Sequence, residues 1–214
     1  MSKLTRDHLA NGSIRSVLSM PTELEWTDEQ LQRSLDATLQ ARPAGAIWVF
    51  AYGSLIWNPL LQFEAESVAT LEGWHRRFCL RTISARGTAD NPGRVLGLEA
   101  GGTTQGVAYR LREDQVASEL HMLWTREMVS GVYLPTWGDV TLNSGDVVSA
   151  IVFVVNVKQA LYEADASVPT VIERAASATG VFGTNADYVL ALDDALRARG
   201  LCDPYVAEIA NALR

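Results

Sequence analysis

The sequence predicts an α+β fold whose sheet is mostly antiparallel or mixed and is curved or closed into a small barrel. Three features favour this class. Strand-like runs dominate residues 47–157, a single amphipathic helix interrupts them, and the last third of the chain is helical. In addition, neither standard Gly-rich phosphate loop occurs, which disfavours a βαβ nucleotide-binding arrangement.

The composition fits a single soluble domain. The chain has 214 residues, of which 48% are hydrophobic and 20% charged, enough for a sizeable core without disulfides. A net charge of -7 argues against nucleic acid or an anionic membrane as partner. Cys79 and Cys202 are far apart, so we expect no disulfide framework and a reducing, cytoplasmic location. No apolar segment follows Met1, and the longest apolar run, residues 150–155, is too short to cross a bilayer.

We expect residues 1–21 to form an irregular N-terminal arm and residues 22–214 to form one domain. The domain begins with a helix, because Thr27 and Gln30 have capping-box spacing and leucines recur at every fourth position after them. Pro43 marks its end. The leucines are Leu31, Leu35 and Leu39.

The continuous apolar run at residues 47–52 predicts a strand buried on both faces, which ends at Gly53. Residues 101–102 and 143–145 have turn-forming composition and should separate neighbouring strands. The further strands expected are residues 67–71, 74–83, 95–99, 105–111, 132–142 and 147–157.

Helices are expected at residues 113–129, 168–178, 186–199 and 204–213. Asn185 and Asp203 are suitable N-cap residues for the last two, and Pro204 suits a first helical position.

Glu127 is the most informative polar residue. It lies seven residues after Leu120 and four after Leu123, so it projects from the apolar face of its helix. A carboxylate in a core is costly, and desolvation raises its pKa toward the range of a working acid or base. The alternative is that the helix has already ended and that Glu127 is solvated.

The sequence Tyr52-Gly53-Ser54 forms a second candidate, at the end of the buried strand. Amide groups in such a turn can hold a carboxylate or an oxyanion. An ordinary strand-to-loop turn is the alternative that the residues alone leave open.

Metal-assisted and nucleophilic chemistry are less well supported. The histidines His8, His75 and His121 are scattered, so we expect no metal site. His75 and Cys79 share a strand, where four residues separate them by roughly 13 Å, and a buried structural thiol is the better interpretation. Several arginines could place a guanidinium near an anionic substrate, or pair with protein carboxylates instead. They are Arg76, Arg77, Arg81, Arg86 and Arg94.

Several separated segments together resemble one known family. Residues 48–59 read WVFAYGSLIWNP, and residues 73–78 read GWHRRF. Further matches, in order, are residues 106–110, 124–133 and 185–188. These segments are similar to the ChaC-type glutathione-specific γ-glutamylcyclotransferases. Two residues depart from the pattern. Ala51 stands where many relatives have Gly, which should matter only if the backbone there needs a positive φ. Val132 stands where eukaryotic members often have a second Gly, which points to the bacterial branch.

The resemblance implies a γ-glutamylcyclotransferase-like fold, a small mixed β-barrel flanked by α-helices. It implies that Glu127 is the catalytic glutamate and that Tyr133 and Tyr188 help to position the substrate. The loop matched to the γ-glutamyl end of the substrate consists of Val49, Phe50, Ala51, Tyr52, Gly53, Ser54 and Leu55.

The activity implied is cleavage of glutathione to 5-oxoproline and Cys-Gly, with no cofactor or metal. Two alternatives remain: cyclisation of another γ-glutamyl amide, and a non-catalytic γ-glutamyl-binding module. The partner expected is the small-molecule substrate, without nucleic acid or membrane, and the enzyme should be a cytoplasmic monomer or weak dimer.

Overall fold

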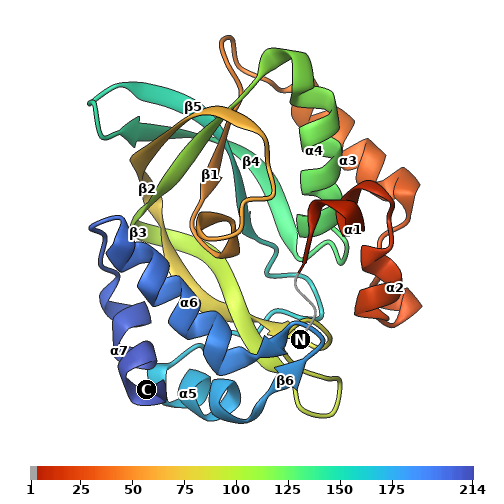
Figure 1. Cartoon of the computed structure of the whole chain (residues 1–214), viewed down its shortest axis with the longest axis vertical. Coiled ribbons are helices and arrows are strands. Elements are labelled where there is room, and N and C mark those ends of the chain that lie inside the picture. The colour runs from red at the N-terminus through yellow and green to blue at the C-terminus, as the bar shows by residue number, and fades with distance from the viewer. Residues whose placement is uncertain (1–3) are drawn as a thin grey trace.

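The structure, a computed structural model, describes residues 4–214 and is built around a closed barrel (Figure 1). The strand order is β1-β3-β2-β4-β5, and β5 pairs with β1 in parallel to close the barrel. All other neighbours are antiparallel, which confirms the mixed barrel. The strands are β1 (Trp48–Ala51), β2 (Phe63–Thr82), β3 (Gly93–Leu111), β4 (Tyr133–Leu142) and β5 (Val147–Val155).

Strands β2 and β3 form one long hairpin of 20 and 19 residues, where the sequence predicts two shorter strands in each. The prediction of a turn between two strands at Gly101 and Gly102 is wrong. Both glycines lie inside β3 with positive φ (103° and 70°), opposite Gly73 of β2 at a shift in register. Such a bulge bends the ribbon without ending it. The bend carries the hairpin beyond the barrel, towards the C-terminal helices (Figure 1).

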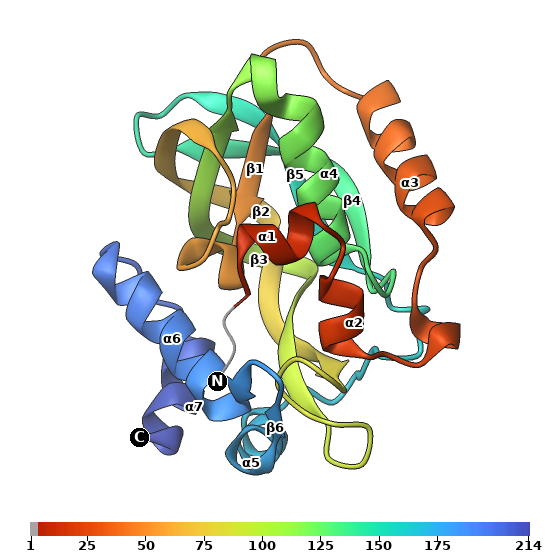
Figure 2. The same ribbon diagram turned by 45° about the vertical axis from the view of Figure 1, so that its right-hand side comes forward.

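The helices cover two sides of this sheet (Figures 1 and 2). Helix α3 (Asp28–Gln40) packs on α4 (Val116–Glu127) beside the barrel, and the capping box of Thr27 and Gln30 is confirmed. Helices α5 (Val168–Ser177), α6 (Asn185–Ala198) and α7 (Pro204–Leu213) pack on one another near the far part of the long hairpin. The short strands β6 (Thr179–Gly180) and β7 (Gly183–Thr184) join α5 to α6.

Asp203 caps α7 as expected, but the cap predicted for Asn185 is wrong. Thr184 caps α6 by accepting a hydrogen bond from the Asp187 amide. Asn185 is fully buried, and its side-chain amide bonds both the N–H and the C=O of Arg94, at 2.6 and 2.7 Å. Because those backbone groups at the start of β3 need partners in the core, Asn185 stabilises the strand rather than the helix end.

The N-terminal arm is not irregular, in contrast to the prediction. It forms two short helices, α1 (Arg6–Ala10) and α2 (Ile14–Leu18), which lie beside α4 in Figure 2. Leu9 and Ile14 are buried with Met122 of α4 in a cluster separate from the main core. Burial of these apolar side chains gives the arm its order. Residues 1–3 of the predicted arm lie outside the described residues.

Of the helices in residues 4–214, none combines the length and the apolar character needed to cross a bilayer.

Candidate active site

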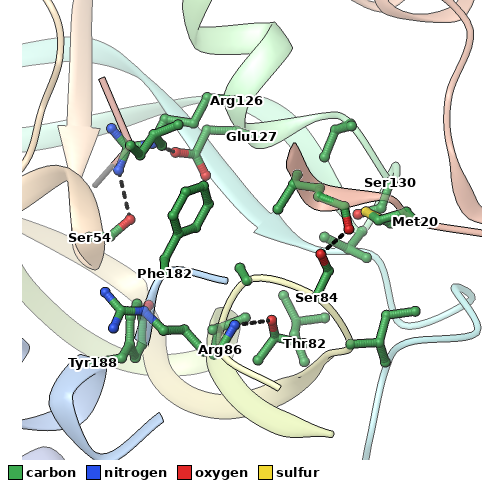
Figure 3. Close-up of a pocket in the computed structure, with 18 of the residues that line it drawn as sticks. Met20, Ser54, Thr82, Ser84, Arg86, Arg126, Glu127, Ser130, Phe182 and Tyr188 are labelled. Atoms are coloured by element: carbon green, nitrogen blue, oxygen red, sulfur yellow. Dashed lines mark hydrogen bonds and ion pairs between the residues drawn. The ribbon is translucent and has the colours of Figure 1, made fainter. Parts of the chain in front are cut away.

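A cavity of about 460 Å³ lies where the end of α4, the bent β2–β3 hairpin, the β6–β7 tip and the N-terminal arm meet (Figure 3). Both apolar and polar side chains line it, as is usual for small-molecule sites. The lining residues of interest are Leu4, Ile14, Leu18, Met20, Ser54, Arg81, Arg86, Arg126, Glu127, Tyr133, Phe182 and Tyr188.

Glu127 is the last residue of α4, and its side chain is only 15% exposed. In Figure 3 its carboxylate points into the cavity towards Phe182. Desolvation raises the pKa of this carboxyl group above its usual value, and the charge of Arg126 partly opposes the rise. Negative charge at a helix C-terminus is unfavourable as well. The alternative of a solvated Glu127 is therefore wrong, although the helix does end at this residue.

Arg126 organises the site and was not anticipated from the sequence. Its Nε lies 2.9 Å from Oε1 of Glu127. Its Nη2 donates to Ser54 Oγ at 2.8 Å, and its Nη1 donates to the Asn58 carbonyl at 2.6 Å. Only its position beside Glu127 could have drawn attention to it, because its other two partners, Ser54 and Asn58, come from a loop distant in sequence.

The loop after β1 brings Ser54 to the cavity wall. Residues Ser54–Ile56 form a 3-10 turn, so the amide N–H groups of Ser54 and Leu55 have no partner within the turn. Gly53 precedes the turn, and the Tyr188 hydroxyl lies 3.6 Å from where a Cβ would stand on Gly53. The loop therefore brings the Ser54 hydroxyl to the cavity, next to backbone N–H groups that the turn leaves free.

Of the segment 49–55, whose contact with a ligand stays a prediction, only Ser54 lines the cavity. Val49, Phe50 and Ala51 are 0% exposed inside β1 and do not line the cavity. Tyr52 and Leu55 are buried too, and the Tyr52 hydroxyl donates to the Phe153 carbonyl at 2.6 Å. A strand buried on both faces sends its side chains into the core, so this segment supports the loop instead. Ala51 has no positive φ, so its departure from Gly fits the strand.

Tyr133 and Tyr188 both line the cavity, with Glu127. The Tyr133 hydroxyl donates to the Leu96 carbonyl at 2.8 Å. Burial raises the pKa of Tyr188 to about 12 and that of Tyr133 well above its usual value. Both therefore keep their protons at neutral pH; the proton of Tyr133 is held by Leu96, whereas Tyr188 can donate to a ligand.

Comparison with known protein families decides where this architecture belongs. The family model described as ChaC-like protein matches residues 47–214. The chain belongs to the ChaC-like family.

Named relatives of this ChaC-like chain agree. It is 46% identical over 202 residues to the glutathione-specific γ-glutamylcyclotransferase of Escherichia coli, covering 94% of this chain and 87% of the relative. It is 31% identical over 176 residues to the human glutathione-specific γ-glutamylcyclotransferase 1, covering 78% of each. A crystal structure of a yeast γ-glutamylcyclotransferase specific to glutathione has the same fold, with a TM-score of 0.73 and 21% identity over 79% of this chain and 96% of that one.

Other chemistries find little support in the described part of this ChaC-like chain. Within residues 4–214, no group of three or more His, Cys, Asp or Glu residues is placed to hold a metal ion. Cys79 is fully buried, and burial raises the pKa of its thiol to about 12, so the prediction of a structural thiol is consistent with its surroundings.

Proposed function

We propose that this ChaC-like chain is a glutathione-specific γ-glutamylcyclotransferase with Glu127 as its general base. The observation that carries the proposal is the carboxylate of Glu127, desolvated and directed into a cavity whose volume suits a tripeptide. The names of the E. coli, human and yeast relatives support glutathione as the substrate.

In the reaction, the α-amine of the γ-glutamyl group attacks its own γ-carbonyl carbon. The new N–C bond closes the five-membered lactam 5-oxoproline, and the bond to the cysteinyl nitrogen breaks to release Cys-Gly. The amine starts as an ammonium, so Glu127 first removes one proton and later supplies it to the leaving nitrogen. The attacking nitrogen loses its second proton as the lactam forms, and that proton ends on the amine of Cys-Gly, which leaves as an ammonium, or in water. A raised pKa suits a group that must both accept and return a proton.

The remaining groups position the substrate. The N–H groups of Ser54 and Leu55 can hold the α-carboxylate or the developing oxyanion, each donor contributing about 3–4 kcal/mol to the transition state. Neutral Tyr188 provides a donor on the same cavity wall, and Tyr133, whose proton is held by the Leu96 carbonyl, can accept a hydrogen bond there. Because nucleophile and electrophile belong to one molecule, most of the work is to fold the glutamyl arm into a reactive shape.

The test compares Glu127→Gln with Glu173→Gln, a control on α5 whose side chain is 74% exposed. We expect Glu127→Gln to lower kcat for 5-oxoproline release by about 100-fold or more, within the range for a lost general base. Glutathione binding by calorimetry should persist, and Glu173→Gln should behave as wild type. An active Glu127→Gln enzyme would remove this residue from the mechanism.

A substrate panel separates this function from the two alternatives. Glutathione, oxidised glutathione, γ-Glu-Ala and γ-Glu-ε-Lys share the amine and the γ-carbonyl and differ in the leaving group. Preference for another member would assign a different γ-glutamyl amide. Tight glutathione binding without product would indicate a non-catalytic module. The expected cytoplasmic location and monomeric or weakly dimeric state stay predictions, and light scattering tests the latter.

A further inference from the structure

Three arginines of the described chain line the cavity, and they differ in their partners. Arg126 pairs with Glu127, and Arg81 pairs with Glu163 at 3.1 Å. Within residues 4–214, by contrast, no carboxylate lies within 4.0 Å of the Arg86 guanidinium, which makes one hydrogen bond, from Nη1 to the Thr184 carbonyl at 3.2 Å. A half-buried cation with spare donors facing a cavity is suited to an anionic ligand.

Arg86 is held in place by its surroundings. Its backbone N–H donates to Thr82 Oγ1 at 3.2 Å. The carbonyls of the two preceding residues, Ser84 and Ala85, each accept a hydrogen bond from the β6–β7 tip, at 3.0 Å. The guanidinium carbon lies 6.0 Å from the centre of the Tyr188 ring, and Figure 3 shows Arg86 beside this tyrosine. Such fixed geometry lowers the entropy cost of binding a ligand.

Arg86 also lies apart from the carboxylate of Glu127. In the view of Figure 3 the ring of Phe182 lies between the two residues. Arg126, by contrast, lies 2.9 Å from the Glu127 carboxylate. The cavity therefore has a proton-accepting region at Glu127 and a separate cationic region at Arg86, beside Tyr188.

We propose that Arg86 binds the glycine carboxylate of glutathione, at the opposite end of the substrate from the reacting amine. This inference rests on the proposed function. The α-carboxylate is two bonds from the amine and must stay near Glu127, but the glycine carboxylate can reach roughly 10 Å further along an extended tripeptide. A guanidinium matches a carboxylate with two parallel hydrogen bonds. Arg86 would then select substrates whose terminal carboxylate lies at this distance from the reacting amine.

The experiment pairs a change in the enzyme with a change in the substrate. Glutathione and its C-terminal carboxamide differ only in the glycine carboxylate, and kcat/KM is measured for both with wild type, Arg86→Gln and Arg81→Gln. We expect wild type to prefer glutathione by about 10- to 100-fold, as for a lost charged hydrogen bond. Arg86→Gln should lower this preference to less than about 3-fold, mainly by losing activity on glutathione.

Arg81→Gln is the matched control, because Arg81 lines the same cavity but already has a carboxylate partner. It should keep the wild-type preference. Arg86→Lys keeps the positive charge and should retain part of the preference for glutathione over its carboxamide. Thermal melting confirms that each variant is folded.

The outcomes separate the inference from the proposed function. Equal loss on both substrates in Arg86→Gln, or no preference in wild type, would overturn the role of Arg86. If wild type forms no 5-oxoproline from either compound, the proposed function fails. In that case the same ratio is measured by calorimetry as relative affinity for the two ligands, with Arg86→Gln against wild type, so the role of Arg86 is still decided.

Discussion

Arg6 of α1 forms a two-pronged ion pair with Glu119 of α4, with nitrogen–oxygen distances of 2.7 and 2.8 Å. The Glu119 side chain is 2% exposed and also accepts a hydrogen bond from the backbone N–H of Gln62 at 2.9 Å. One buried carboxylate thus holds together the N-terminal arm, the helix that ends at Glu127 and the loop before β2. This pair fastens the arm whose apolar residues close one side of the cavity.

Arg6→Ala should therefore destabilise the protein by about 1–2 kcal/mol. The change leaves a buried carboxylate without its cation, but Arg6 itself is 34% exposed, which reduces the cost below that of a fully buried pair. Urea unfolding measures the difference. The control is Arg33→Ala, whose contact with Glu29 is long and exposed and should not matter measurably. Equal stability of the two variants would contradict this role of Arg6.

Gly131 should tolerate alanine poorly. Its φ is 61°, and an added Cβ would lie 2.1 Å from Nε1 of Trp26, so both the backbone and the neighbouring indole would have to shift. We expect a loss of about 2–4 kcal/mol in thermal or urea unfolding. Gly200→Ala is the matched control, with φ of 71° and open space around it, and should lose about 1 kcal/mol. Similar losses at both positions would show that the contact with Trp26 does not matter.

Replacing Glu127 by Gln should stabilise the protein at pH 8. The folded-state pKa of Glu127 is raised, so the folded state binds the proton more tightly than the unfolded state, and stability falls as pH rises between the two pKa values. Each pKa unit of this rise costs about 1.4 kcal/mol above that window. The gain of Glu127→Gln should therefore be largest at pH 8 and shrink towards pH 5. Melting curves of both proteins at pH 8 and pH 5 test this expectation. A stability gain of Glu127→Gln that grows as the pH falls would show that folding lowers the pKa of Glu127.

Substitution of Arg126 should move the acidic limb of the pH–rate profile. Its positive charge lowers the pKa of Glu127, so Arg126→Gln should let that pKa rise and shift the loss of kcat/KM to higher pH. Arg126→Lys keeps the charge and should shift the limb less, although activity falls in both variants because a lysine cannot hold Ser54 and Asn58 together. If the acidic limb of the pH–rate profile stays unchanged in both variants, Glu127 is not the group whose protonation lowers kcat/KM.

Local signals in the sequence predicted most of the elements. The capping box at Thr27 and Gln30 and the apolar run of residues 47–52 correspond to α3 and β1, because both depend on neighbours in the chain. The errors lie where longer-range contacts decide. Gly101 and Gly102 bend a strand instead of ending it, and Asn185 bonds Arg94, distant in the chain, rather than capping a helix.

The candidate site divides in the same way. Apolar periodicity placed Glu127 on the buried face of its helix, and motif resemblance selected Tyr133 and Tyr188, all three of which line the cavity. The same resemblance included Val49, Phe50 and Ala51, whose side chains lie in the barrel core. A contiguous motif does not distinguish residues that touch a ligand from those that support them.

The sequence by itself determined most helices and strands and the face of the helix on which Glu127 lies, because periodicity and caps act over a few residues, and the family resemblance added the mixed barrel. The tertiary structure alone decided the partners of Arg126, the order of the N-terminal arm and the position of Arg86 on the cavity wall. Each of these depends on charged, hydrogen-bonding or apolar groups brought together from distant parts of the chain. The strength of their interactions depends on burial, which exists only after folding.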